Sequence, residues 1–155
     1  MTGTTPGTTP QTTTVHATTV ALDGVAVLLR GPPGAGKSDL ALRLIDQGAR
    51  LVADDQTVLT RRGAAVLASA PPTIAGRLEV RGIGIVTLAP AQDVAVGLVV
   101  DLAPAQAIER LPEPENTALL GVSVALIRID PGAVSAAAKV RLAVHQLRGD
   151  KMAPP

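Results

Sequence analysis

The chain has 155 residues, a length that fits one domain, with 14 basic and 13 acidic residues and a net charge of +1. Hydrophobic residues make up 46% of it, yet Phe, Tyr, Trp and Cys are all absent. The balanced charge and the lack of aromatic rings argue against a nucleic-acid partner, and the lack of cysteine excludes disulfides and thiolate metal sites. No apolar run approaches the ~18 residues of a membrane-spanning helix, so we expect no membrane partner.

The first fourteen residues, Met1 to Thr14, are almost all Thr, Gly and Pro. Such a segment cannot bury enough apolar surface to fold, so we expect a disordered tail over residues 1–14 and one folded domain over residues 15–150. The tail lacks the basic and apolar regions of a signal peptide, which favours a cytoplasmic protein.

The folded part begins with a predicted hairpin. Val15 to Ala21 is a β-branched and apolar run with a single histidine, His16, and Val25 to Arg30 is a second strand-like run. Leu22-Asp23-Gly24 lies between them, and Asp-Gly between two such runs is a strong hairpin signal.

The next eight residues match the phosphate-binding loop pattern G-x-x-x-x-G-K-[ST] at every fixed position. They are Gly31, Pro32, Pro33, Gly34, Ala35, Gly36, Lys37 and Ser38. A helix is predicted from Lys37 to Gln47, closed by Gly48, so the loop opens onto a helix N-terminus where backbone N–H groups and the helix dipole favour an anion. In this motif the lysine reaches the β- and γ-phosphates and the serine hydroxyl binds Mg²⁺, which predicts ATP and Mg²⁺ as cofactors.

Two adjacent carboxylates follow the next predicted strand, Ala49 to Ala53. Asp54 and Asp55 would lie at a strand end, where ligands bind in α/β sheets. Neighbouring side chains of an extended segment point in opposite directions, so one carboxylate can face a metal ion or a hydroxyl while the other makes structural bonds. The spacing does not decide which, and a pair of solvated turn residues is the alternative interpretation.

Two further hairpin-like segments follow. Residues 57–60 and 64–68 flank Arg61-Arg62-Gly63, which we interpret as a solvated hairpin tip or, alternatively, a docking patch for an acidic partner. Residues 78–88 contain Glu79 and Arg81, which alternate with apolar residues and would share one side of a strand. The alternative to a functional role for these two side chains is an exposed ion pair.

The remainder contains two apolar strands and a second helix. Val94 to Leu102 is nearly all apolar and predicts a central strand, Pro104 to Glu115 is a connector, Val122 to Ile129 is another strand, and Ala133 to Leu147 predicts a helix. Because strands outnumber helices, we predict an α/β fold in which the phosphate-binding loop follows a strand of a mixed sheet.

Three segments together resemble a known family. Gly31 to Ser38, then Asp54-Asp55, then Leu78-Glu79-Val80-Arg81-Gly82-Ile83-Gly84-Ile85-Val86 resemble the catalytic domain of HPr kinase/phosphorylase. The resemblance extends from about residue 15 to about residue 148 and implies the fold of that domain. It also implies Mg·ATP-dependent phosphorylation of a serine in the phosphocarrier protein HPr. Full-length members carry an additional N-terminal domain, so the chain resembles a short, catalytic-domain form.

The resemblance assigns roles to individual residues. Lys37 and Ser38 match the phosphate-binding lysine and the Mg²⁺-binding serine, and Glu79 matches a metal-linked glutamate, with Asp54 as a further candidate at the metal. Asp55 matches the residue that takes the proton from the target serine.

Two more catalytic residues are implied by position. His16 falls where the family has its active-site histidine, and Arg110 resembles a catalytic arginine. On the residues alone, a single histidine beside a β-run is more often structural than functional.

One departure bears on the reverse reaction. The family's Pro-Gly-Arg-Asn segment, tied to dephosphorylation, is replaced here by Pro131-Gly132-Ala133-Val134. The resemblance therefore implies the kinase reaction more than the phosphorylase reaction. The segment between Val86 and Val94 is shorter than in the family, so a homo-oligomer of the family's hexameric type is an open expectation.

Two other functions remain open from the sequence. One is a kinase of small metabolites, although the chain has no arginine-bearing lid of the kind those enzymes use. The other is a nucleotide-sensing module without catalysis, an alternative that the altered segment at residues 131–134 keeps open.

Overall fold

Strands dominate the structure, a computed structural model that describes residues 11–149. Over these residues eleven strands accompany two α-helices and one short 3₁₀ helix. In chain order they are β1 (Thr12–Val15), β2 (Thr18–Leu22), β3 (Val25–Arg30), α1 (Lys37–Asp46), β4 (Arg50–Ala53), β5 (Thr57–Arg62), β6 (Ala65–Ser69), β7 (Arg77–Val80), β8 (Gly84–Thr87), β9 (Val94–Leu102), η2 (Ala105–Ala107), β10 (Glu115–Leu119), β11 (Val122–Ile129) and α2 (Ala136–Leu147). The predicted α/β fold with few helices is confirmed.

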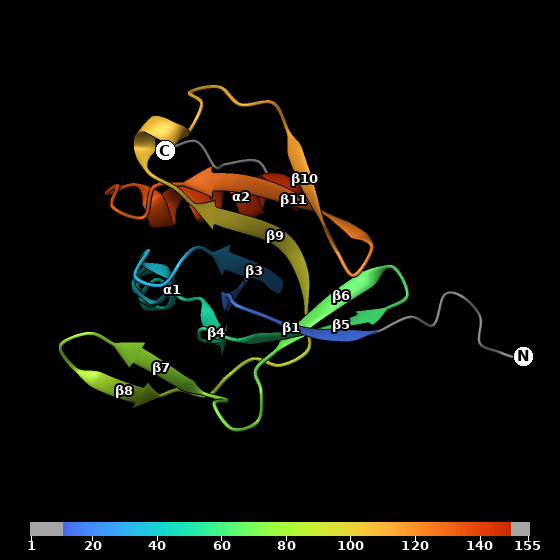
Figure 1. Cartoon of the computed structure of the whole chain (residues 1–155), viewed down its shortest axis with the longest axis vertical. Helices are drawn as coiled ribbons and strands as arrows, with labels where there is room; N and C mark the ends of the chain where they lie inside the picture. The colour runs from blue at the N-terminus through green and yellow to red at the C-terminus, as the bar shows by residue number, and fades with distance from the viewer. Residues whose placement is uncertain (1–10, 150–155) are drawn as a thin grey trace, which may run out of the picture.

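Nine of the strands form one mixed sheet, and β9 is its central member. The order is β1-β5-β6-β9-β3-β2-β4, and β11 pairs with both β9 and β10. β9 pairs in parallel with β3 and β11 and antiparallel with β6. In Figure 1 it curves from β6 towards β3 and β11. The prediction of a central strand at residues 94–102 is confirmed, and its almost unbroken apolar run is typical of a strand covered on both faces.

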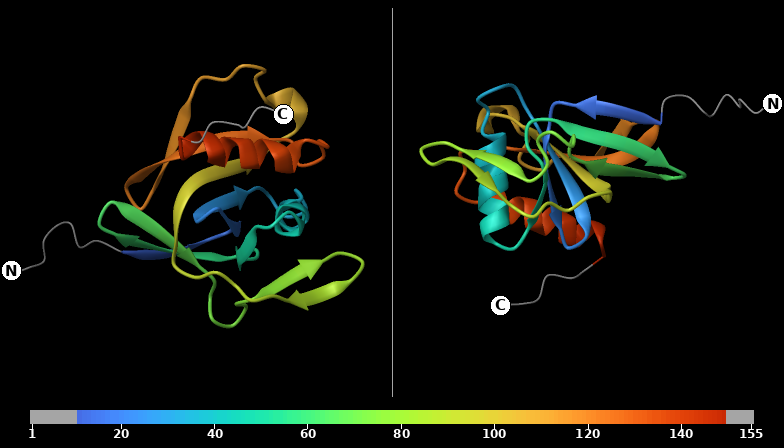
Figure 2. Two further views of the ribbon diagram at one scale, coloured as in Figure 1. Left: turned by 180° about the vertical axis from the view of Figure 1, so that it is seen from behind. Right: turned by 90° about the horizontal axis from the view of Figure 1, so that it is seen from below.

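The two faces of this sheet bury two separate apolar layers. On β3, Val27 and Leu29 face the layer formed with α1 and α2, whereas Ala26 and Leu28 face the layer formed with β5, β6 and β10. The back view in Figure 2 shows α2 lying across β9 and β11. Since the chain has no aromatic residue, both layers are packed from Leu, Val, Ile and Ala alone.

The predicted hairpin at the start of the domain is also confirmed. β2 and β3 are antiparallel, with Val20 opposite Val27. The two turn residues, Asp23 and Gly24, have φ angles of 52° and 79°. Positive φ at both central residues is the turn that matches the twist of a two-residue hairpin, which explains the Asp-Gly pair.

The strands β7 and β8 form a separate two-stranded sheet at the lower edge of the molecule in Figure 1. Its inner side chains Leu78 and Val80 are buried against Leu51 of β4. Its outer side chains, including Glu79 and Ile85, which lie opposite each other, are exposed. The hairpin is thus held to the body by its apolar face.

Several boundaries differ from the sequence-based expectation. Arg61 and Arg62, expected at a hairpin tip, belong to β5, and the run from Val15 to Ala21 is divided between β1 and β2. The tail predicted over residues 1–14 is wrong at its end, because Thr12–Val15 forms β1 and pairs with β5. Threonine is β-branched and suits an edge strand once β5 supplies a partner. Residues 1–10 lie outside the described part.

Two further differences lie in the C-terminal third. β10 begins where the predicted connector ends, and pairing with β11 makes it a strand. The last helix begins at Ala136 instead of Ala133. The residues before it form turns instead, with backbone hydrogen bonds from Ala133 N–H to Asp130 and from Ala136 N–H to Ala133. Within residues 11–149, no helix is long and apolar enough to cross a membrane.

Candidate functional site

The glycine loop lies between β3 and α1, as its sequence context predicted. Gly34 and Gly36 have φ angles of 80° and 105°, a conformation that side-chain-bearing residues rarely adopt. Gly36 is the N-cap of α1, and no side chain caps this helix end. The first backbone N–H groups of α1 are therefore available to an anion, and the helix dipole favours one there.

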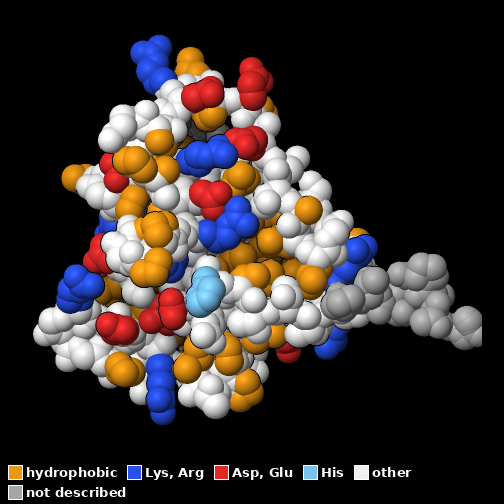
Figure 3. Space-filling model, in the orientation of Figure 1, with side chains coloured by type: hydrophobic (Ala, Val, Ile, Leu, Met, Phe, Trp, Pro, Cys, Tyr) orange, Lys and Arg blue, Asp and Glu red, His pale blue; other side chains and the backbone are white. Residues whose placement is uncertain are grey.

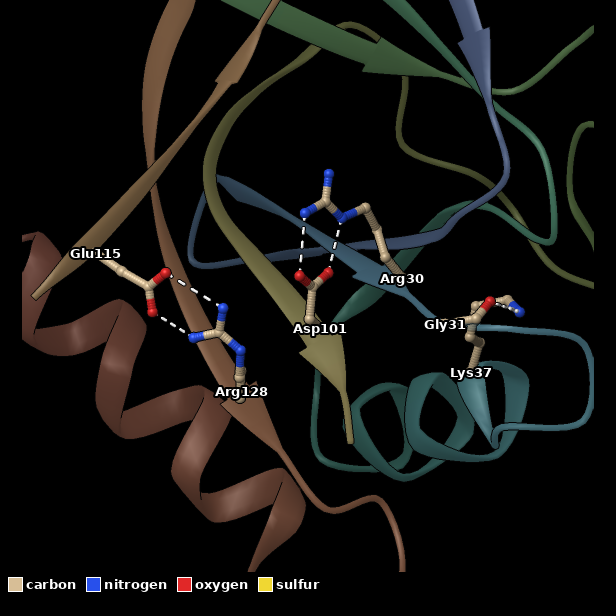
Figure 4. A network of polar contacts seen from close by, with 6 residues as sticks. All are labelled: Arg30, Gly31, Lys37, Asp101, Glu115 and Arg128. Atoms are coloured by element: carbon tan, nitrogen blue, oxygen red, sulfur yellow. Dashed lines mark hydrogen bonds and ion pairs between the residues drawn. The ribbon is translucent and has the colours of Figure 1, made fainter. Parts of the chain in front are cut away.

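Lys37 is folded over the loop from the first turn of α1. Its side chain is largely buried, and its Nζ donates to the carbonyl oxygens of Gly31 at 2.7 Å and Pro32 at 3.1 Å. Figure 4 shows the ammonium group next to the carbonyl of Gly31. The two carbonyls hold the ammonium at the loop, and phosphate oxygens would offer it stronger, charged acceptors.

Asp54 is the most heavily bonded side chain of the site. Its Oδ1 accepts hydrogen bonds from the hydroxyls of Ser38 at 2.6 Å and Thr18 at 3.0 Å, and its Oδ2 accepts one from the backbone N–H of Glu79 at 3.0 Å. All three partners donate to it, as an ionised carboxylate requires. Asp54 therefore joins α1, β2 and β7 at one point.

Asp55 is arranged in the opposite way. It is exposed and lines the pocket beside the loop, and its φ angle of 69° is left-handed. Such a conformation is uncommon for a residue other than glycine and is often found at functional sites. Both aspartates line the pocket, but Asp54 is buried in a hydrogen-bonded network and Asp55 is exposed.

A pocket of about 530 Å³ collects the side chains of the site. Its charged lining comes from the first turn of α1, the residues after β4 and the β7–β8 hairpin, and consists of Lys37, Asp39, Asp54, Asp55, Glu79 and Arg81. Glu79 on β7 and Arg81 in the turn that follows are both exposed and both line this pocket. Opposite charges around one opening suit a ligand that carries both phosphate groups and a cation.

The residues at the pocket fit a magnesium ion. Ser38 Oγ and Asp54 Oδ1 lie 2.6 Å apart, and both are oxygen ligands of the kind that Mg²⁺ prefers. Within residues 11–149, no group of three His, Asp or Glu side chains could hold a metal alone. A magnesium ion here would take its other ligands from nucleotide phosphates and water, which is its usual mode of binding.

Two predicted catalytic residues lie outside the pocket lining. His16 is exposed between β1 and β2, and its neighbour Ala17 donates a backbone hydrogen bond to Asp55 O at 3.1 Å. Arg110 is exposed in the connector after η2. The roles of both residues stay predictions, while the structure brings together Lys37, Ser38, Asp54, Asp55 and Glu79.

A larger pocket, of about 920 Å³, lies between the connector and α2. Its lining is mainly apolar and includes Ile108, Ile127 and Leu147, but none of the predicted site residues. The chemistry of the lining, and not the size of the cavity, therefore identifies the smaller pocket as the candidate site.

A row of charged side chains fixes the strand ends from which the loop departs. Arg30 of β3 and Arg128 of β11 both lie in register with Asp101 of β9. Arg30 donates to Asp101 at 2.7 and 3.1 Å, and Arg128 pairs with Glu115 of β10 (Figure 4). The bidentate pair at Arg30 holds the residue immediately before Gly31.

The face of the molecule in Figure 3 shows basic and acidic side chains interspersed, with no large patch of one charge.

Sequence reasoning missed two residues that support the site. Thr18 is fully buried and bonds to Asp54, but a threonine in a strand gives no such signal in the sequence. Arg43 donates to the carbonyls of Pro131 and Ala133, which holds that segment beside Gly36. The signal in the sequence that could have pointed to Arg43 is its i,i+4 spacing from Asp39, with which it pairs.

Comparisons with known proteins agree with this architecture. The family model described as "HPr Serine kinase C-terminal domain" matches residues 8–152. An HPr kinase/phosphorylase of Lacticaseibacillus casei is 34% identical over 117 residues, which are 68% of this chain and 37% of that protein. One of Chlorobium phaeobacteroides is 37% identical over 131 residues, which are 76% of this chain and 39% of that protein.

A solved structure gives the same result at the level of the fold. The Hpr(Ser) kinase/phosphatase from Coxiella burnetii aligns with a TM-score of 0.77 and 26% identity, over 88% of this chain and 98% of the solved one. The chain spans less than two fifths of the two curated relatives described above, and the family match covers nearly all of it. The resemblance that the sequence suggested is therefore confirmed, and the chain belongs to the HPr serine kinase C-terminal domain family.

Proposed function

We propose that this protein transfers the γ-phosphoryl group of Mg·ATP to a serine of an HPr-type phosphocarrier protein in the cytoplasm. The observation that carries the proposal is the single pocket in which Lys37, the Ser38–Asp54 pair and Asp55 meet. Phosphoryl transfer needs little covalent chemistry from the protein and depends on positioning, charge neutralisation and an oriented nucleophile.

Each requirement has a candidate in the pocket. The uncapped N-terminus of α1 and the ammonium of Lys37 would bind the phosphates. Ser38 and Asp54 would hold the magnesium ion, which when bound neutralises phosphate charge, and Glu79 lines the same opening. Asp55, exposed on the open side, would accept the proton of the attacking serine hydroxyl.

The acceptor is proposed from the relatives, which are named for their action on HPr. Those names also include a phosphorylase or phosphatase, so reversal is a further part of the proposal. The segment at residues 130–134 lies beside the phosphate-binding loop, where a Cβ added to Gly36 would meet Pro131 at 3.3 Å. Because Ala133 and Val134 carry no polar group, we expect this segment to assist the reverse reaction less than the forward one.

The test is intact-mass analysis of an HPr-type protein after incubation with this chain and Mg·ATP. We expect a single added phosphate on a serine, and no addition with Lys37→Ala. Added inorganic phosphate would then measure reversal. No mass shift despite measurable ATP binding would contradict the proposal and favour a nucleotide-sensing role.

A further inference from the structure

We propose that Thr18 is a positioning residue that holds both aspartates of the pocket at once, an inference that rests on the proposed function of this pocket. Thr18 lies on β2, outside the glycine loop and outside β4, the strand that the aspartates directly follow. Its side chain is 0% exposed, so its hydroxyl must find partners within the protein.

The hydroxyl of Thr18 donates one hydrogen bond and accepts another, both with residues of the site. Its one proton goes to Asp54 Oδ1 at 3.0 Å, and its oxygen accepts the backbone N–H of Asp55 at 3.1 Å. One atom therefore fixes the side chain of Asp54 and the main chain of Asp55. This bond pattern links the candidate metal ligand to the candidate base.

The contact to Asp54 bears on the candidate magnesium site. Oδ1 is the oxygen shared by Thr18 and Ser38, and Oδ2 is bonded to the N–H of Glu79. Without the Thr18 hydroxyl, one of the three donors is lost, and only Ser38 and the N–H of Glu79 hold the carboxylate. Groups that orient a metal ligand in this way typically change metal affinity by about 10–100-fold when removed.

The contact to Asp55 bears on the direction of that side chain. Asp55 has a left-handed φ of 69°, which costs free energy for a residue with a Cβ. Two hydrogen bonds of the Asp55 main chain offset this cost. Its N–H donates to the hydroxyl of Thr18, and its carbonyl accepts from the N–H of Ala17 at 3.1 Å. Loss of the first lets the segment relax to an ordinary conformation and turns the carboxylate away from the pocket.

The next residue on the strand provides a matched control. Thr19 is also 0% exposed, but its hydroxyl lies 2.8 Å from the hydroxyl of Thr57, whose own proton goes to the carbonyl of Ala17. Since a hydroxyl has one proton, Thr19 is the donor to Thr57. Thr19→Val thus removes a buried hydroxyl from the same strand without touching either aspartate.

The experiment compares wild type with Thr18→Val, Thr18→Ser and Thr19→Val. The first readout is Mn²⁺ affinity in the presence of a non-hydrolysable ATP analogue, measured from the signal of free Mn²⁺ in electron paramagnetic resonance. The second is the rate of transfer to an HPr-type protein. We expect Thr18→Val to weaken Mn²⁺ binding by about tenfold and to lower transfer further, because both aspartates are affected. Thr18→Ser, which keeps the hydroxyl, and Thr19→Val should each stay within about threefold of wild type in Mn²⁺ affinity.

Unchanged Mn²⁺ affinity in a folded Thr18→Val protein would overturn the inference. So would an equal loss in Thr18→Val and Thr19→Val, since that would indicate a general effect of a buried hydroxyl. If Thr18→Val does not fold, Thr18→Ala removes the same hydroxyl with less bulk and replaces it in the comparison. A wild-type protein that binds Mn²⁺ with the analogue but transfers nothing would contradict the proposed function and leave the Mn²⁺ comparison as the test of Thr18.

Discussion

Lys37 and Asp55 differ in how the surrounding structure holds them, and this decides what their removal should do. Lys37 is largely buried with two carbonyl partners, so its ammonium is a fixed feature of the loop. Asp55 is exposed, and its position is set by its main chain. We therefore expect the lysine to contribute to nucleotide binding and the aspartate to the transfer step.

Lys37→Ala should weaken the binding of an ATP analogue by about 10–100-fold, because a charged hydrogen bond to phosphate is lost. Transfer to the acceptor should be abolished. Isothermal titration calorimetry measures the affinity, and Lys139→Ala, at an exposed lysine of α2, is the control. Wild-type affinity in Lys37→Ala would place the phosphates elsewhere.

Asp55→Asn should leave the affinity for the nucleotide within about twofold while lowering the transfer rate by about 10²-fold, the usual contribution of a general base. The amide keeps the shape of the side chain and removes its ability to accept the proton. Single-turnover kinetics with saturating nucleotide separate the two effects. A normal rate in this variant would show that Asp55 is not the base.

Among the secondary-structure elements, α1 and the segment between β11 and α2 are joined by one side chain. Arg43 pairs with Asp39, donates to the carbonyls of Pro131 and Ala133, and has an Nε without a hydrogen-bond partner in the described residues. The two carbonyls that it holds belong to the turn that connects β11 to α2. Arg43 thereby holds Pro131, the neighbour of Gly36, through main-chain carbonyls of the segment.

Arg43→Met keeps the aliphatic length and removes these bonds. We expect the free energy of unfolding to fall by roughly 1–3 kcal/mol, the range for hydrogen bonds from a charged group. Nucleotide affinity should fall as well, because Pro131, which lies beside Gly36, loses its hydrogen bond from Arg43. Chemical denaturation measures the first effect, and Arg62→Met, at an exposed position of the β5–β6 hairpin, should change neither quantity.

The pairing of β10 with β11 contains a titratable contact. The hydrogen bond from Arg128 lowers the pKa of Glu115 below its usual value of 4.5, and the charge of Arg128 acts in the same direction. A lowered pKa in the folded state means that the stabilisation is complete above the usual pKa and is lost as the pH falls through the lowered one. NMR titration of the Glu115 carboxyl should give a midpoint below 4.5, and Arg128→Gln should raise it. An unchanged midpoint in that variant would contradict this cause.

At the scale of the whole molecule, one sheet separates two apolar layers that contain no aromatic side chain. Leucines are therefore the largest side chains available to either layer. Leu28, on the β5–β6 side of β3, is fully buried. The removal of one such leucine leaves a cavity that small β-branched neighbours in a sheet cannot fill by rotation alone.

Leu28→Ala should lower the free energy of unfolding by about 2–5 kcal/mol, as for other buried leucines. Leu111→Ala, at a connector residue that is 81% exposed, should change it by less than about 0.5 kcal/mol. Urea denaturation of both variants tests the difference. Equal effects would mean that the layer on this face tolerates the cavity.

The sequence by itself determined the local structure and the chemistry of single segments. The loop at Gly31–Ser38, the Asp23-Gly24 hairpin and the central strand follow from short-range rules of backbone geometry and apolar patterning. The predictions were wrong for β1 and β10, because the strands that pair with them lie elsewhere in the chain. The start of α2 was also wrong, because a hydrogen-bonded turn precedes the helix.

Only the tertiary structure decided which of the two aspartates is buried in hydrogen bonds and which is exposed. Alternation along the chain predicts that Asp54 and Asp55 point apart, but not which of them meets Ser38, Thr18 and the N–H of Glu79. Those partners lie 16, 36 and 25 residues away along the chain. Hydrogen bonds over such separations depend on which strands pair and in which register, and that is set by the packing of the whole sheet.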